Sequence, residues 1–216
     1  METLESINEK TRCAYNLAAE KYHNLFHNEL NEKEYDRKLL DRFADNFTSG
    51  SLICDAGCGP SAHISRYLSD KGLNVIGVDI SDRCIEMAKE LNPFMQFVRE
   101  DIANLSFESG SLDGIVSYYS IIHTPKRAIS KIIKEFNRTL KSDGYLLIAV
   151  KAGCSESTLS ELSGIKTEIY FSFFTEYEIR EYFANESFKI EFFEKRNPYD
   201  FEIKNERIFS IGRKIL

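Results

Sequence analysis

The sequence predicts an α/β protein with a doubly wound, mostly parallel sheet of seven strands and helices on both faces. Three observations support this fold class. Apolar runs of strand length recur along the chain, helical stretches with one apolar face follow the first, second and fourth of them, and Gly and Pro mark the turns. Strands that alternate with helices in this way form crossover units, and crossover units build a parallel sheet.

The expected strands occupy short apolar runs, at residues 52–54, 75–78, 94–98, 114–118, 145–150, 188–194 and 207–212. Ser81 is expected to cap the helix after the second strand, because a serine hydroxyl can accept a free N–H of the first turn. Thr124 followed by Pro125 is typical of a helix start. Near the N-terminus, Asn31 and Glu34 resemble a capping box. The sequence therefore marks the beginnings of its helices as well as its strands.

Charge and composition exclude several classes of function. The chain carries 28 Lys and Arg against 34 Asp and Glu, a net charge of −6, and no dense basic run, so we expect no nucleic-acid partner. The N-terminus has neither a basic segment nor an apolar run, which predicts no signal peptide and no membrane partner. Five scattered cysteines predict reduced thiols and no metal site. These features predict a cytoplasmic protein.

A glycine turn follows the first expected strand. Residues 57–62, Gly-Cys-Gly-Pro-Ser-Ala, formally match a dinucleotide fingerprint, with the acidic Asp79 further along. Asp55 stands where a pyrophosphate would approach, and its carboxylate would repel that group but suit an ammonium. Pro60 also removes one N–H from a phosphate cradle. The turn therefore favours a ligand with an ammonium group and no phosphate over a nicotinamide dinucleotide.

Three segments in order resemble the cofactor motifs of class I S-adenosylmethionine-dependent methyltransferases. They are Ile53-Cys54-Asp55-Ala56-Gly57-Cys58-Gly59, Gly77-Val78-Asp79-Ile80-Ser81 and Arg99-Glu100-Asp101-Ile102. The resemblance runs from about residue 14 to the C-terminus. It implies an antiparallel last strand, an N-terminal helical lid, S-adenosylmethionine as cofactor and S-adenosylhomocysteine as product.

The resemblance also implies a role for each motif. The loop at Asp55 would hold the amino-acid end of the cofactor, Asp79 would accept the ribose hydroxyls, and Asp101 would face the adenine. Cys84 stands where the family commonly places Met against the adenine, so it either lines that pocket or belongs to the core. The residues assigned to the cofactor are Tyr15, Tyr22, Asp55, Ala56, Gly57, Cys58, Gly59, Asp79, Ile80, Cys84, Asp101, Ile102 and Tyr118.

The two lid tyrosines come from the segment Tyr15-Asn16-Leu17-Ala18-Ala19-Glu20-Lys21-Tyr22, which resembles the Tyr-rich lead-in helix of many family members. Tyr15 would reach the carboxylate of the methionine moiety; plain helix packing is the alternative. We divide the single domain into a lid (1–47), a cofactor-binding core (48–151), an insertion (152–174) and a C-terminal helix with a strand pair (175–216).

Acceptor residues are sought beyond the carboxyl ends of the strands, where ligands lie in doubly wound sheets. His123 is the candidate catalytic residue, because histidine exchanges a proton near neutral pH; a ring satisfied by the backbone beside Thr124 is the alternative. The substrate candidates are Tyr119, Lys151, Arg196, Tyr199 and Arg207. The arginines suit capture of a carboxylate, and their alternative is pairing with Glu161, Glu202 or Glu206.

These expectations describe a methyltransferase that moves a methyl group to a small, anionic metabolite by in-line displacement. A tRNA or protein methyltransferase is one alternative, and a non-catalytic S-adenosylmethionine-binding module is another. The sequence does not identify the acceptor, the element that is methylated or the oligomeric state.

Overall fold

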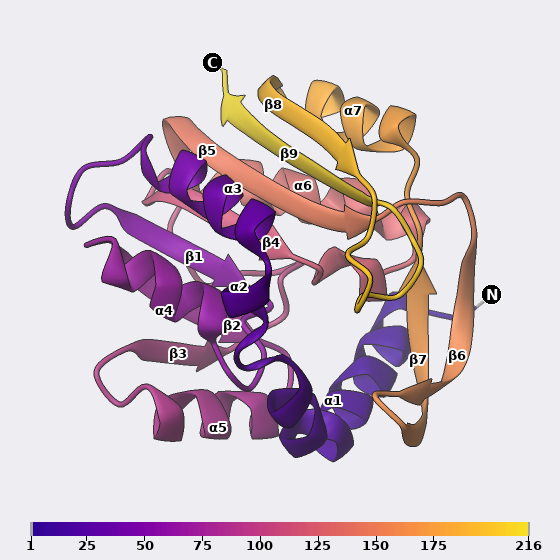
Figure 1. The fold of residues 1–216 in the computed structure, drawn as a ribbon. Helices are drawn as coiled ribbons and strands as arrows, with labels where there is room; N and C mark the ends of the chain where they lie inside the picture. The colour runs from indigo at the N-terminus through magenta and orange to yellow at the C-terminus, as the bar shows by residue number, and fades with distance from the viewer. Residues whose placement is uncertain (1, 216) are drawn as a thin grey trace.

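The computed structural model describes residues 2–215 and is built around one seven-stranded sheet (Figure 1). Its strands are β1 (Leu52–Ala56), β2 (Asn74–Asp79), β3 (Gln96–Arg99), β4 (Leu112–Tyr118), β5 (Leu140–Lys151), β8 (Phe188–Arg196) and β9 (Arg207–Lys214). Their spatial order is β3-β2-β1-β4-β5-β9-β8. β9 is antiparallel to both of its neighbours, and the other pairings are parallel. The predicted fold class is confirmed.

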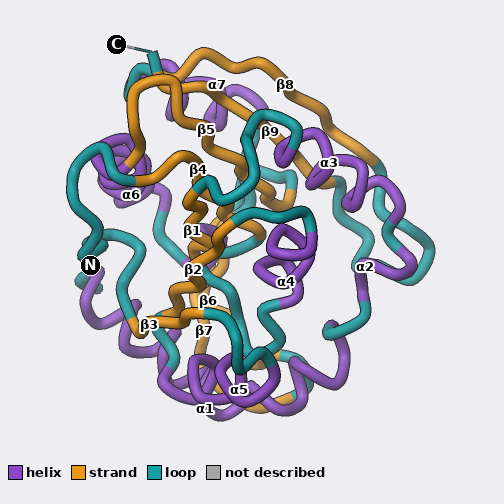
Figure 2. Tube along the Cα trace, turned by 90° about the vertical axis from the view of Figure 1, so that its left-hand side faces the viewer, coloured by secondary structure: helices purple, strands orange, loops and turns teal. Residues whose placement is uncertain are grey.

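Helices cover both faces of this sheet. On one face, α3 (Glu34–Ala44) and α4 (His63–Asp70) pack against β1, and on the other, α6 (Lys126–Thr139) packs against β4 and β5 and α7 (Glu176–Asn185) packs against β8 and β9. α5 (Asp82–Leu91) flanks β2 and β3. At the N-terminus lie the long α1 (Leu4–Phe26) and the short α2 (Glu29–Glu32), and a 3-10 turn, η1 (Ile121–His123), follows β4. Figures 1 and 2 both place α1 beside α5, at the β3 side of the molecule.

Two of the three predicted helix starts differ in the structure. Ser81 accepts the Cys84 N–H at 3.1 Å and caps α5 as predicted. The capping box at Asn31 is wrong: Asn31 lies inside α2, and Lys33 precedes α3 without a side-chain cap. Thr124 does not cap α6 either. Pro125 has ψ 140°, outside the helical region, so Pro125 itself precedes the helix and α6 begins at Lys126.

The predicted insertion is a β-hairpin. β6 (Glu156–Leu162) and β7 (Ile165–Ser172) pair antiparallel across Ser163-Gly164, both of which have positive φ. Two such residues suit a tight hairpin turn, a signal that the sequence analysis missed. β6 is exposed almost throughout, whereas β7 packs against α1. The hairpin therefore braces the lid helix from outside the main sheet.

Among residues 2–215, no helix is both long enough and apolar enough to cross a bilayer. Residues 1 and 216, at the ends of the predicted lid and of the C-terminal segment, lie outside the described range.

Candidate active site

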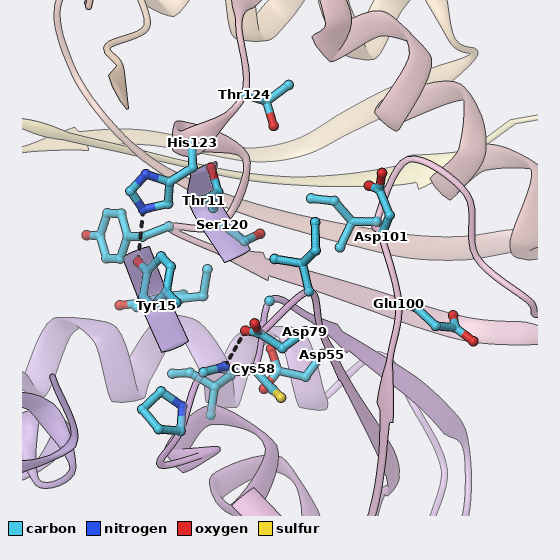
Figure 3. Close-up of a pocket in the computed structure, with 18 of the residues that line it drawn as sticks. Thr11, Tyr15, Asp55, Cys58, Asp79, Glu100, Asp101, Ser120, His123 and Thr124 are labelled. Carbon is cyan, nitrogen blue, oxygen red and sulfur yellow. Dashed lines mark hydrogen bonds between the residues drawn. The ribbon is translucent and has the colours of Figure 1, made fainter. Parts of the chain in front are cut away.

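A cavity with about 1000 Å³ of empty space, open solvent at its mouth included, lies beyond the carboxyl ends of β1, β2 and β4 (Figure 3). α1 closes one side of it, and the glycine turn, the β3 loop and η1 form the rest. The predicted residues that line it are Tyr15, Tyr22, Asp55, Gly57, Cys58, Gly59, Asp79, Ile80, Asp101, Ile102, Tyr118, Tyr119 and His123.

Six predicted residues do not line this cavity. Ala56 and Cys84 are both fully buried in the core, Cys84 in a small cluster with Ala19 and Met87. For Cys84, the structure therefore favours the core over the pocket. The other four, all candidates for the acceptor, lie beyond the cavity wall at the ends of β5, β8 and β9: Lys151, Arg196, Tyr199 and Arg207.

The glycine turn uses its own amide groups internally. Gly57 and Cys58 donate to the Val78 carbonyl at 2.8 and 2.9 Å, and Gly59 donates to Asp79 at 3.0 Å. Gly57 has φ +91°, and a Cβ built on it would lie 2.3 Å from Cβ of Ser120. Because these three N–H groups already have partners, they do not form the open anion cradle that a diphosphate requires. The prediction against a dinucleotide agrees with this geometry.

The three predicted aspartates line the cavity in sequence order. Asp55 is 1% exposed and accepts the Ser65 hydroxyl at 2.5 Å, and burial raises its pKa to about 6. Asp79 accepts the Gly59 and Ser81 N–H groups, and burial raises its pKa as well. Asp101 accepts the Ala103 N–H at 2.8 Å. Each carboxylate accepts at least one hydrogen bond from the protein and still borders the cavity.

α1 is tied by side chains to the loops that surround the cavity. Asn8 donates to Asp101 at 2.7 Å, and the Ser81 hydroxyl donates to Asn16 at 2.6 Å. His23, further along α1, lies 3.0 Å from the Ser61 hydroxyl in the glycine turn. The lid therefore contacts all three of the segments that the sequence analysis identified as motifs or their continuation.

Tyr15 and His123 meet at the wall of the cavity (Figure 3). Nδ1 of His123 lies 2.9 Å from the Tyr170 carbonyl, and Nε2 lies 2.9 Å from the Tyr15 hydroxyl. A carbonyl can only accept, so Nδ1 carries the hydrogen and the neutral Nε2 accepts from Tyr15. Burial, together with the nearby Lys151 charge, lowers the pKa of His123 to about 4 despite the carbonyl bond. The ring is satisfied by a backbone carbonyl, as in the alternative weighed, although that carbonyl belongs to Tyr170 on β7 and not to the segment beside Thr124.

This geometry makes a prediction for NMR. The His123 ring proton signals, assigned by comparison with His123→Asn, should titrate with a midpoint near the pKa of about 4 rather than at the ordinary 6.5. Because the folded pKa lies below the unfolded one, the stability that the neutral ring contributes is present above pH 6.5 and is lost as pH falls towards 4. A midpoint above 6 would show that the ring is not buried against Tyr170.

The two predicted acceptor arginines are already paired. Arg196 donates to Asp36 at 2.9 Å and to Glu202 at 2.8 Å, and Arg207 Nε lies 3.2 Å from Glu202. Burial alone would raise the pKa of Glu202, but bonds from Arg196 and the Tyr199 N–H and the charge of Lys33 lower it to about 2. Of the alternatives weighed, the structure shows pairing with Glu202. Neither guanidinium is free to bind a substrate carboxylate.

Tyr199 belongs to the same buried group. Its hydroxyl accepts the Tyr35 N–H at 2.9 Å, and its ring lies 4.4 Å from the Arg196 guanidinium carbon. The Tyr118 hydroxyl donates to Asp36. These contacts join the loop between β8 and β9 to α3, so Tyr199 has a packing role in this structure rather than a place over a ligand.

The cavity residues to which the sequence analysis assigned no role include Glu29, His63, Glu100 and Ser120. His63 lines the cavity with Nε2 2.8 Å from Glu29. It begins the helix that follows the glycine turn, and this position is the signal that could have identified it. Glu29 comes from α2, whose approach to the turn no local pattern predicts.

Comparisons with known proteins agree with this geometry. Residues 54–148 match the family model of the methyltransferase domain. A 2-methyl-6-phytyl-1,4-hydroquinone methyltransferase from Synechocystis is 33% identical over 108 residues, 49% of this chain and 33% of that protein. The chain thus spans about a third of the length of this relative.

Solved structures share the fold across nearly the whole chain. Burkholderia thailandensis 1,6-didemethyltoxoflavin-N1-methyltransferase, with bound S-adenosylhomocysteine, superposes with a TM-score of 0.77 at 15% identity, covering 100% of this chain and 92% of that one. Magnesium protoporphyrin IX methyltransferase from Synechocystis, with bound S-adenosylmethionine, gives 0.74 at 18% identity, covering 99% and 100%. At these identities the likeness establishes the fold, and the site must be argued from its own residues.

Proposed function

We propose that this chain is a class I S-adenosylmethionine-dependent methyltransferase and that it transfers a methyl group from S-adenosylmethionine to a small molecule. The observation that carries the proposal is the cavity lined in order by Asp55, Asp79 and Asp101, beside a glycine turn without a phosphate cradle.

The cavity residues suit this cofactor chemically. Asp55 and Glu29 provide negative charge for an ammonium group, and Asp79 keeps lone pairs for ribose hydroxyls. Ile80 and Ile102 give apolar surface for a purine ring, with Asp101 beside it. When bound, S-adenosylmethionine would supply an electrophilic methyl group on a sulfonium with an activated leaving group. Tyr22 and Tyr118 also line the cavity.

The chain contributes alignment and exclusion of water. Displacement at a methyl group needs its reacting atoms about 3 Å apart and in line. α1 covers the cavity with Tyr15, and His123 fixes the Tyr15 hydroxyl by accepting its hydrogen. A ring with a pKa of about 4 is a poor proton acceptor at neutral pH, so we assign His123 a positioning role rather than that of a general base.

The acceptor class is inferred from several features together. The methyltransferases named above act on a hydroquinone, a didemethyltoxoflavin and a magnesium porphyrin, all small molecules. A net charge of −6 without a basic run disfavours a tRNA substrate. An intact set of cavity carboxylates and a closing lid favour an enzyme over a binding module that has lost its activity.

Replacing Asp79 with alanine tests the proposal. The variant should bind S-adenosylmethionine more weakly by about 1–3 kcal/mol, since ligand hydroxyls and the Gly59 and Ser81 N–H groups lose an acceptor. Isothermal titration calorimetry measures the change, and Asp70→Ala, at an exposed acid at the far end of α4, is the matched control. Unchanged affinity in a folded Asp79→Ala protein would remove Asp79 from the site. The native protein should show no binding of a nicotinamide dinucleotide.

A further inference from the structure

Three basic side chains stand in one row across neighbouring strands. Lys151 at the end of β5 pairs in register with Arg207 on β9, and Arg207 pairs with Arg196 on β8. Like charges directly opposite one another destabilise a sheet. A row of three cations in the protein interior therefore requires anions close by.

The basic side chains around this row outnumber the acidic ones by one. Around this row lie four basic side chains, Lys33 included, and three acidic ones, from Glu29, Asp36 and Glu202. Glu202 pairs with Lys33 and with both arginines, Asp36 pairs with Arg196, and Glu29 pairs with Lys33. One positive charge remains in excess.

That excess charge is located on Lys151. Among residues 2–215, no carboxylate lies within 4.0 Å of its ammonium group, and no hydrogen bond uses it. The Nζ atom lies instead 5.0 Å from the centre of the Phe171 ring. Lys151 is only partly buried, so a ligand can reach it.

Lys151 lies next to the wall of the candidate active site. The Phe171 ring that it faces is 5.4 Å from the His123 ring, centre to centre, and His123 lines the cavity. β5 is the neighbour of β4, and the residues that follow β4, Tyr119 and Ser120, line the same cavity. The ammonium therefore lies on the sheet edge where ligands of this fold bind.

We propose that the ammonium group of Lys151 binds an oxyanion of the methyl acceptor, a carboxylate or a phosphate-type group, so that the acceptor is an anionic small molecule. This inference rests on the proposed function, because it takes the neighbouring cavity as the place of methyl transfer. The sequence suggested the arginines for this role, but their charges are neutralised within the protein. Lys151 is the one basic side chain of the row that has no anion.

The electrostatic surroundings of Lys151 agree with this role. Burial, with the positive charges of Arg207 and Lys33, lowers the pKa of Lys151 to about 8, although Glu202 and Glu29 raise it in part. The neutral His123 ring is the other titratable group beside it. Lys151 loses its charge as pH rises through about 8, so anion binding should weaken above that pH. A bound anion should in turn raise its pKa, because it favours the charged form.

Titration of the full-length protein with benzoate and with inorganic phosphate tests the site, with benzamide as the uncharged probe. The protein is saturated with S-adenosylhomocysteine, and ionic strength is held constant. Lys151→Met should weaken binding of at least one anion by about tenfold or more, since a charge-assisted contact is lost. Lys151→Arg should retain it, and so should Lys134→Met, which removes an exposed lysine of α6. Benzamide should not distinguish the variants.

A second readout reports on Lys151 itself in the native protein. Bound benzoate or phosphate should slow acylation of Lys151 by acetic anhydride, followed by mass spectrometry, and should leave Lys134 unprotected. Equal anion affinity in Lys151→Met, or no protection in the native protein, overturns the inference. If S-adenosylhomocysteine itself does not bind, the proposed function fails, and the same acylation experiment on the free protein still decides whether Lys151 binds anions.

Discussion

Replacing Gly57 with alanine is expected to cost about 2–5 kcal/mol of stability and to weaken S-adenosylmethionine binding more than tenfold. A new Cβ would lie 2.3 Å from Cβ of Ser120, and the residue has φ +91°, which disfavours any side chain. Neither Cβ is the end of a flexible side chain, so the turn or the β4 loop must move. The glycine turn and the β4 loop both line the cavity, so either movement disturbs the cofactor site. Urea unfolding measures the loss of stability, and calorimetry measures the loss of cofactor affinity.

Gly50→Ala separates the contact from the backbone cost. Gly50 has φ +84°, close to that of Gly57, but nothing lies within 4 Å of a Cβ built on it. This control should lose about 1–2 kcal/mol, the cost of a left-handed residue, and should bind the cofactor normally. If the two variants lose equal stability and bind alike, the close approach of Gly57 to Ser120 does not exist in solution.

The sheet was predictable because its signals are local. Each strand of the main sheet is a short apolar run, and Ser81 and Thr175 cap their helices with neighbouring residues. The hairpin of residues 156–172 was missed because β6 is rich in Ser and Glu and exposed. The hairpin is held in place by the packing of β7 against α1, which is a contact between distant parts of the chain.

The same distinction separates the two halves of the site. Asp55, Asp79 and Asp101 each follow or end a strand, so their place at one edge follows from the topology. Arg196 also stands at a strand end, but its partner Asp36 is 160 residues away in sequence and comes from α3. Spacing gives no information about such a pairing. The sequence therefore located the basic row but not which of its members is free.

Replacing Arg196 with methionine is expected to lower the free energy of unfolding by about 3–5 kcal/mol. Asp36 is fully buried, and it would keep the Tyr118 hydroxyl but lose the guanidinium that balances its charge. An unpaired buried carboxylate is costly because the interior solvates it poorly. Urea unfolding measures the loss, and calorimetry with S-adenosylhomocysteine should show that the folded variant still binds the cofactor, since Arg196 lies outside the cavity.

Two further proteins identify buried charge as the cause. Lys38→Met breaks an ion pair with Glu34 of similar length, 2.6 Å, whose side chains are 73% and 69% exposed, and this control should lose at most about 1 kcal/mol. Adding Asp36→Leu to Arg196→Met should recover part of the loss, because the double variant no longer buries an unpaired carboxylate there. If Arg196→Met costs no more than Lys38→Met, water solvates the charges of Arg196 and Asp36. The charge count that leaves Lys151 without an anion would then not describe a buried network. A large loss that Asp36→Leu partly reverses establishes the balanced network from which Lys151 alone is left out.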